Sequence, residues 1–201
     1  MPHFKSISGL LAVVAVASAL AQTAIAPSPL EGCTADDYAI YAAALNDRFG
    51  KQKKPERVVL LDQTSMGVPP GMAAMTQFGG KAQTLLKDVP KEAKDDFDSR
   101  NKARAKIEGG EIKAAFEVIL LSAEEAGKLV AGGGGWEGFY NKYPNSGITL
   151  VSRPGLNAEH NRALLYLGTS CGGLCGDGVL IVLSKNGEEW KVLNRVTIWV
   201  S

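Results

Sequence analysis

The last third of the chain consists of strand-like apolar runs joined by very short connections. The runs cover residues 147–152, 162–168, 178–184 and 190–200. Such short connections leave room only for antiparallel neighbours, because a parallel pair needs a crossover of about a dozen residues or more. The spacing therefore predicts a four-stranded antiparallel meander that dominates the sheet of the protein.

The connection between the last two runs carries the strongest turn signal of the chain. Asn186-Gly187 favours a two-residue hairpin turn in which both residues adopt positive φ. Such a turn predicts that Leu183 and Trp190 lie on paired strands.

Four segments before the meander have the pattern of helices. Thr34 can cap the first, which ends at Gly50 and carries its apolar side chains on one face. The second segment carries Asp95, Asp96 and Asp98 among lysine and arginine residues, which predicts a solvated charged face. The three later helices are expected at residues 89–108, 122–130 and 136–143.

Two further strands and one long loop complete the predicted domain. Short apolar runs predict strands at 58–61 and 116–121, and the Gly-, Pro- and Met-rich residues 64–83 predict a loop. The expected fold class is α+β, a single domain over residues 34–201. We expect the helices to pack on one face of the antiparallel sheet.

The first 21 residues predict a cleaved signal peptide. Lys5 precedes an uncharged apolar run, Leu10–Leu20, that is too short to remain in a bilayer as a spanning helix. Ala19-Leu20-Ala21 offers the small residues that a signal peptidase needs. The mature chain would then begin at Gln22.

A second cleavage choice and a lipid anchor are the alternatives at this end of the chain. Cleavage after residue 26 would place Pro27 directly after the cut, which makes it the second choice. Cys33 lies well beyond the apolar run, so we expect no lipidation there. Residues 22–33 are expected to form a mobile segment before the domain.

The nearly equal numbers of basic and acidic residues limit the kinds of partner that we expect. Removal of residues 1–21, which hold one lysine and no acid, leaves 21 basic and 21 acidic residues. A balanced charge argues against nucleic acid as the main partner, and no run in the mature chain is long enough to span a membrane. We expect a soluble protein of the periplasm or the cell exterior, with a protein or small-molecule partner in the cell envelope.

Cys171 and Cys175 are predicted to form a disulfide, because two cysteines this close in an exported protein should oxidise. Glycines on both sides give the backbone the freedom that such a small ring requires. We interpret the bond as a staple at the tip of a hairpin. The candidate ligand-binding residues around this loop are Ser170, Asp177, Tyr143 and Asn145.

A thiol-redox or Cu(I)-handling function of the same cysteine pair is the alternative. A disulfide that closes so small a loop can be easy to reduce. In the reduced state, the sulfurs of Cys171 and Cys175 together with those of Met72 and Met75 would suit Cu(I). No basic residue stands near the cysteines in the sequence to lower a thiol pKa.

The catalytic patterns in the chain are incomplete. Gly168–Gly172 fits the G-x-S-x-G motif of serine hydrolases, but a strand follows Ser170 where that motif needs a helix. His160 precedes the serine and is expected roughly 20 Å from the cysteines, at the far end of strand 162–168. We therefore predict no catalytic residue and no cofactor. The leading hypothesis is a non-catalytic binding module, and an enzyme without a recognisable local motif is the third possibility.

Three segments of the C-terminal region resemble a family of uncharacterised exported bacterial proteins. They are Tyr143-Pro-Asn-Ser-Gly147, Ser152-Arg-Pro-Gly-Leu-Asn157 and Cys171-Gly-Gly-Leu-Cys-Gly176, followed by a closing strand with tryptophans. The resemblance covers residues 136–201. It implies a shared domain and no particular activity.

Overall fold

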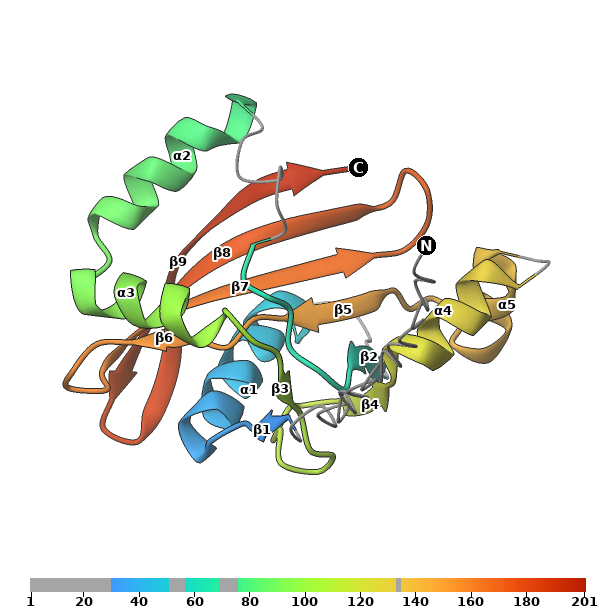
Figure 1. Ribbon diagram of the computed structural model, residues 1–201, viewed down its shortest axis with the longest axis horizontal. Coiled ribbons are helices and arrows are strands. Elements are labelled where there is room, and N and C mark those ends of the chain that lie inside the picture. Colours follow the sequence, from blue (N-terminus) through green and yellow to red (C-terminus); the bar gives the residue numbers. More distant parts are fainter. Residues whose placement is uncertain (1–29, 51–56, 69–75, 133–134) are drawn as a thin grey trace, which may run out of the picture.

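The computed structural model describes residues 30–50, 57–68, 76–132 and 135–201, which form an α+β fold around a seven-stranded mixed sheet (Figure 1). The strand order is β4-β2-β5-β7-β8-β9, and the short β6 also pairs with β7. The predicted signal peptide lies outside the described residues. The strands are β2 (Arg57–Leu61), β4 (Glu117–Leu121), β5 (Ile148–Val151), β6 (Gly155–Leu156), β7 (Arg162–Ser170), β8 (Gly176–Asn186) and β9 (Glu189–Val200).

The last strands pair antiparallel in chain order, and the earlier strands extend the sheet in parallel. β5 pairs with β7, β7 with β8 and β8 with β9, all antiparallel, while β6 adds a second partner to β7. β2 lies parallel to both β4 and β5. Helical connections separate β2 from β4 and β4 from β5, which gives the chain the length that a parallel crossover needs.

The β8–β9 hairpin turns one residue later than its sequence signal predicts. Gly187 has a φ of 61°, but Asn186 belongs to β8 and pairs with Glu189. Leu183 and Trp190 lie on the paired strands β8 and β9, as predicted, with Trp190 opposite Lys185 and Leu183 opposite Val192. The two central residues of the turn are therefore Gly187 and Glu188, and only the first of them adopts positive φ. One glycine is enough for such a turn, so Asn186 remains extended as the last residue of β8.

The helices cover both faces of the sheet, so the prediction that they pack on one face is wrong. The side chains of α1 pack against Val58, Leu165 and Ile181, whereas those of α2 and α3 pack against Leu164 and Leu180, which point to the opposite face. Strands with continuous apolar runs have two faces to bury, and one helical layer covers only one of them. The helices are α1 (Ala35–Phe49), α2 (Thr76–Lys87), α3 (Lys91–Arg100), α4 (Ala123–Ala131) and α5 (Trp136–Lys142).

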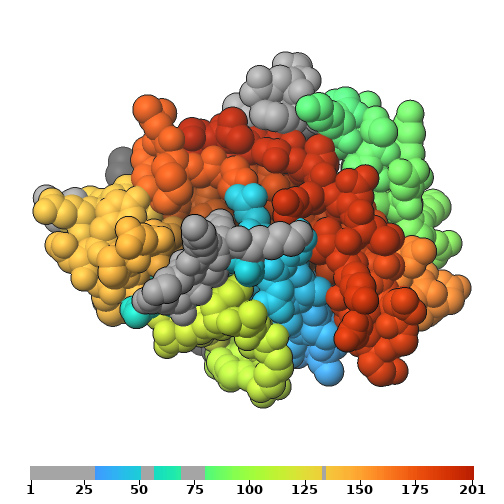
Figure 2. Space-filling view, turned by 180° about the vertical axis from the view of Figure 1, so that it is seen from behind, coloured from blue at the N-terminus to red at the C-terminus, as the bar shows by residue number. Residues whose placement is uncertain are grey.

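The two helical layers differ in extent. α2 and α3 lie over the β7–β9 part of the sheet, and α4 and α5 lie beside β2 and β4 (Figure 1). The view from behind shows α1, in blue, between the red β8–β9 hairpin and the yellow-green residues near 110 (Figure 2). Within the described ranges, no helix is long and apolar enough to cross a membrane.

The sequence prediction missed one helix, α2, and placed the end of another, α3, too late. α2 begins at Thr76, inside the residues predicted as a loop, because Leu85 and Leu86 pack on the sheet and compensate for the poor helix propensity of two glycines. α3 ends at Arg100, and the following residues form β3 (Ala105–Lys106). Packing against the sheet therefore stabilises a helix, α2, where local propensity predicts a loop.

A second, two-stranded sheet holds the start of the described chain. β1 (Glu31–Gly32) pairs in parallel with β3, and the Cys33 N–H donates to the Lys106 carbonyl. Of the segment 22–33 that the sequence predicts to be mobile, residues 31–33 are thus hydrogen-bonded to the domain.

The segment that links β5 to β7 is buried over its first part, although only two of its residues form a strand. Residues 152–157 are all buried, and α3 packs against β6 within them. A Cβ atom at Gly155 would lie 2.2 Å from the Ala93 carbonyl oxygen and 2.4 Å from the Phe97 nitrogen. Helix and loop therefore touch through their backbones at this glycine.

We predict that Gly155→Ala destabilises the domain by about 3 kcal/mol or prevents folding, because backbone atoms cannot yield to the added methyl group. Urea denaturation followed by circular dichroism measures the change. Gly173→Ala is the matched control, since a Cβ atom there meets no atom within 4 Å. Equal stabilities of the two variants would contradict the close approach.

Candidate functional site

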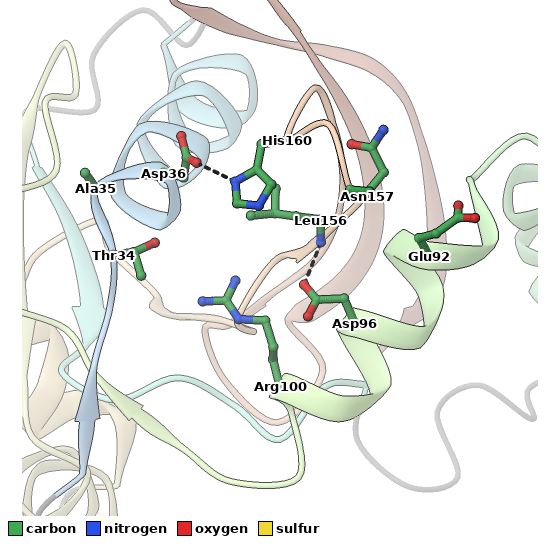
Figure 3. Close-up of a pocket in the computed structure, with 10 residues that line it drawn as sticks. Thr34, Ala35, Asp36, Glu92, Asp96, Arg100, Leu156, Asn157 and His160 are labelled. Carbon is green, nitrogen blue, oxygen red and sulfur yellow. Dashed lines mark hydrogen bonds and ion pairs between the residues drawn. The ribbon is translucent and has the colours of Figure 1, made fainter.

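A cleft of about 660 Å³ opens between the start of α1, one side of α3 and the loop that joins β6 to β7 (Figure 3). Most of the side chains that line it are charged or polar, and they come from segments far apart in the sequence. They are Thr34, Ala35, Asp36, Glu92, Asp96, Arg100, Leu156, Asn157, Ala158 and His160.

A buried ion pair forms the base of the cleft. Arg100, in the last turn of α3, donates from Nη1 and Nη2 to the two carboxylate oxygens of Asp37, at 2.9 Å each. Nη1 also donates to the Pro154 carbonyl at 2.7 Å, so one guanidinium joins α1, α3 and the buried loop. Burial alone would lower the pKa of Arg100, but the hydrogen bond and charge of Asp37 raise it overall.

The first turn of α1 positions Asp37 for this contact. Thr34 caps the helix by accepting the Asp37 N–H, and the Thr34 N–H donates to Asp37 Oδ2 at 2.9 Å. This reciprocal capping box fixes the carboxylate at the helix N-terminus, where negative charge is favourable. The sequence prediction that Thr34 caps this helix is confirmed.

Two further side chains, Asp96 of α3 and Asn101 directly after its end, bind the backbone of the buried loop. Asn101 accepts the Arg153 N–H and donates to the Arg153 carbonyl, both at 2.9 Å. Asp96 Oδ2 accepts the Leu156 N–H at 2.8 Å (Figure 3). A buried loop without such partners would leave costly unpaired backbone groups, so these contacts make its burial possible.

The upper side of the cleft is formed by His160 and Asp36. His160 Nδ1 and Asp36 Oδ2 lie 3.1 Å apart, and Lys185 Nζ reaches Asp36 Oδ1 at 3.4 Å. The hydrogen bond to His160 is the main cause that holds the pKa of Asp36 below its usual value. His160 has a φ of 51°, a left-handed conformation held by the Asn157 side chain, which accepts the N–H groups of Asn161 and Arg162.

Several groups at the cleft keep unused hydrogen-bonding capacity. Within the described residues, Glu92 makes no hydrogen bond or ion pair, and Asp96 uses only one of its two carboxylate oxygens. His160 uses Nδ1 for Asp36, so its Nε2 remains for a ligand. The cleft thus combines a rigid base with polar groups available at its rim.

The cleft lacks the partners of a nucleophilic site among its lining residues. Its one hydroxyl belongs to Thr34, whose Oγ1 already serves the helix cap. The His160–Asp36 pair therefore has no adjacent nucleophile to activate. In the part of the chain that the structure describes, no group of three or more His, Cys, Asp or Glu side chains is arranged to hold a metal ion.

The Cys171–Cys175 disulfide lies at the opposite end of β7 from His160. The two cysteines are bonded to each other, with their Cα atoms 4.9 Å apart, and the Tyr140 hydroxyl of α5 donates to the Cys171 carbonyl. Leu174, at the tip of this loop, is 92% exposed. Bonded to each other, the two sulfurs are not thiolates, so Cu(I) binding would need prior reduction.

The four residues predicted to bind a ligand near this loop do not form a common site. Tyr143 is buried against Phe139, and Asn145 is exposed with a φ of 58°. Ser170 is exposed at the end of β7, and Asp177 forms an ion pair with Arg48 of α1 at 2.6 Å. None of them lines the cavities of about 660, 610, 440 and 330 Å³ found among the described residues.

The third cysteine is unpaired and half-buried. Cys33 Sγ lies 3.7 Å from the Tyr41 hydroxyl, and burial raises the pKa of its thiol. Met72 and Met75, the thioether ligands of the alternative hypothesis, lie outside the described residues.

Sequence reasoning missed the residues that build the cleft. The acidic and basic residues of α3 were interpreted as a solvated face, yet Asp96 and Arg100 point toward the buried loop and α1 (Figure 3). The available signal was the four-residue spacing of Glu92, Asp96 and Arg100, which places them on one side of a helix. The role of His160 could not be predicted, because its partner Asp36 lies more than a hundred residues earlier.

Comparison of the chain with protein-family models, with curated proteins and with solved structures finds no significant match.

We predict that Arg100→Leu lowers the free energy of unfolding by about 3 kcal/mol, because it leaves the fully buried Asp37 carboxylate without its counter-charge. Urea denaturation at neutral pH measures the loss. Arg195→Leu is the matched control: it removes an ion pair to Asp47 of α1, but its side chain is 45% exposed. We expect the control to lose less than about 1 kcal/mol. Equal losses would show that the buried pair contributes no more than a surface pair.

For the disulfide, we predict that the double variant Cys171→Ser/Cys175→Ser loses at most about 2 kcal/mol of stability, because so small a closed loop removes little entropy from the unfolded chain. Thermal and urea unfolding of the variant and of the control Cys33→Ser would be compared with the wild type. Failure of the double variant to fold would mean that the bond is essential to the domain.

Proposed function

We propose that this chain is an exported, non-catalytic binding module whose ligand site is the cleft between α1, α3 and the β6–β7 loop. The signal-peptide pattern of residues 1–21 supports export. The observation that carries the binding proposal is the convergence of Glu92, Asp96 and His160 at the open side of the cleft, above a base whose polar groups are already satisfied.

The charges around the cleft define the class of ligand. Asp36, Glu92 and Asp96 line it. Asp36 is already paired with His160 and Lys185, and Arg100, the one arginine among the lining residues, is neutralised by Asp37, so Glu92 and Asp96 supply the unpaired charge. Ionised carboxylates only accept hydrogen bonds, so they favour a ligand that offers donors. The proposed ligand is a small polar molecule with a primary amine, or a basic side chain of a protein partner.

Three probes with the same five-carbon chain test this proposal on the full mature chain: 1,5-diaminopentane, 1,5-pentanediol and glutarate. The expected result is that the diamine alone shifts the amide signals of Asp36, Leu156 and His160 in two-dimensional NMR spectra. Shifts scattered over the surface, or equal shifts with glutarate, would contradict a cleft selective for donors.

Two variants make the test specific to the cleft. Glu92→Gln should weaken diamine binding roughly fivefold, because it removes a charge that makes no ion pair with any described residue. Glu188→Gln, in the exposed β8–β9 turn, is the control and should leave the affinity unchanged. An unchanged affinity of Glu92→Gln would place the binding elsewhere.

A further inference from the structure

A second cavity, of about 440 Å³, lies between α2, α3 and the face of the sheet formed by β7, β8 and β9. Figure 1 shows both helices on the same side of these strands. The cavity shares no lining residue with the cleft of the proposed function. Its volume falls in the range of roughly 300–1,000 Å³ that is typical of small-molecule sites.

The floor of this cavity is apolar. It is formed by Leu164, Leu180 and Ile198, each at most 6% exposed, and Leu86 and Phe97 form the wall on the helical side. Water in such a space finds few hydrogen-bond partners. An apolar group that replaces this water is therefore favoured by the hydrophobic effect.

One cation lies at the edge of the apolar space. Lys94 of α3 is half-buried and lines the cavity, and its Nζ donates to the Leu86 carbonyl at 3.1 Å. An ammonium group has three donors, and within the described residues no carboxylate lies within ion-pair distance of this one. Its remaining donors and its charge are available to a ligand.

We propose that this cavity binds a small amphipathic anion, with its apolar body on Leu164, Leu180 and Ile198 and its acidic group on Lys94. The argument combines an apolar volume of ligand size with one half-buried cation, Lys94, for which the described residues supply no ion-pair partner. Removal of part of the surrounding water strengthens the attraction between Lys94 and a carboxylate.

Asp98 is the one acidic residue that lines the same cavity, and it would favour a cationic ligand instead. Its side chain is exposed and makes no ion pair with Lys94. Water screens an exposed charge more than a half-buried one, so the lysine should decide the sign of the ligand.

Octanoate, 1-octanol and octylammonium, which share one apolar tail, test the proposal on the full mature chain. In methyl NMR spectra, octanoate should shift the signals of Leu164, Leu180 and Ile198. The methyl groups of Leu165 and Ile181, which point to the opposite face of the same strands, are the internal control and should stay in place. Equal shifts on both faces, no shifts, or tighter binding of octylammonium would overturn the proposal.

Variants separate the role of the charge from that of the apolar space. Lys94→Met should weaken octanoate binding roughly tenfold through loss of a charge-assisted hydrogen bond, and should leave 1-octanol binding unchanged. Lys91→Met, which removes a lysine paired with Asp95 on the same helix, is the matched control and should leave both affinities unchanged. Ala82→Phe, which fills the cavity from α2, should abolish binding of both probes. Retained octanoate affinity in Lys94→Met would overturn the assignment even if Ala82→Phe did not fold.

Discussion

The buried ion pair between Asp37 and Arg100 fixes how the two helical layers and the sheet meet. Asp37 is fully buried, and burying a carboxylate costs several kcal/mol unless a partner of good geometry compensates for it. Arg100 supplies two parallel hydrogen bonds, and the Thr34 N–H supplies a third. The pair can therefore exist only where α1 and α3 approach at one distance and in one orientation.

The same arginine explains why the loop after β5 can be buried. Its bond to the Pro154 carbonyl, together with the contacts of Asn101 and Asp96, gives the loop backbone the partners that water would otherwise provide. Gly155 then allows α3 to lie directly on this loop. The Ser152–Asn157 segment thus has a structural role in this chain and contributes to one side of the cleft.

The sequence predicted those parts of the fold that depend on local patterns. The Thr34 cap, the strands at 58–61 and 116–121 and the antiparallel order of the last strands follow from short-range chemistry. The placement of helices on both faces depends on which faces of the strands need cover, and the start of α2 depends on packing that overcomes its glycines. Neither could be derived from local propensity.

The cleft could not be predicted from the sequence for a related reason. Its residues gain their roles from partners more than fifty positions away, such as Asp37 with Arg100 and Asp36 with His160. A charged helix face has the same local pattern whether it meets water or a buried backbone. Only the three-dimensional contacts distinguish Asp96 and Arg100 from the exposed residues beside them.

Native-state hydrogen exchange tests most directly whether the side chains of Asp96 and Asn101 hold the buried loop in place. The two informative amides are those of Arg153 and Leu156, whose N–H groups donate to Asn101 and Asp96. The account predicts that both exchange as slowly as amides in the centre of β7 and β8, because they open only when the domain unfolds. Exchange as fast as that of the exposed Gly173 amide would show that the loop opens independently, and would contradict the central role of these contacts.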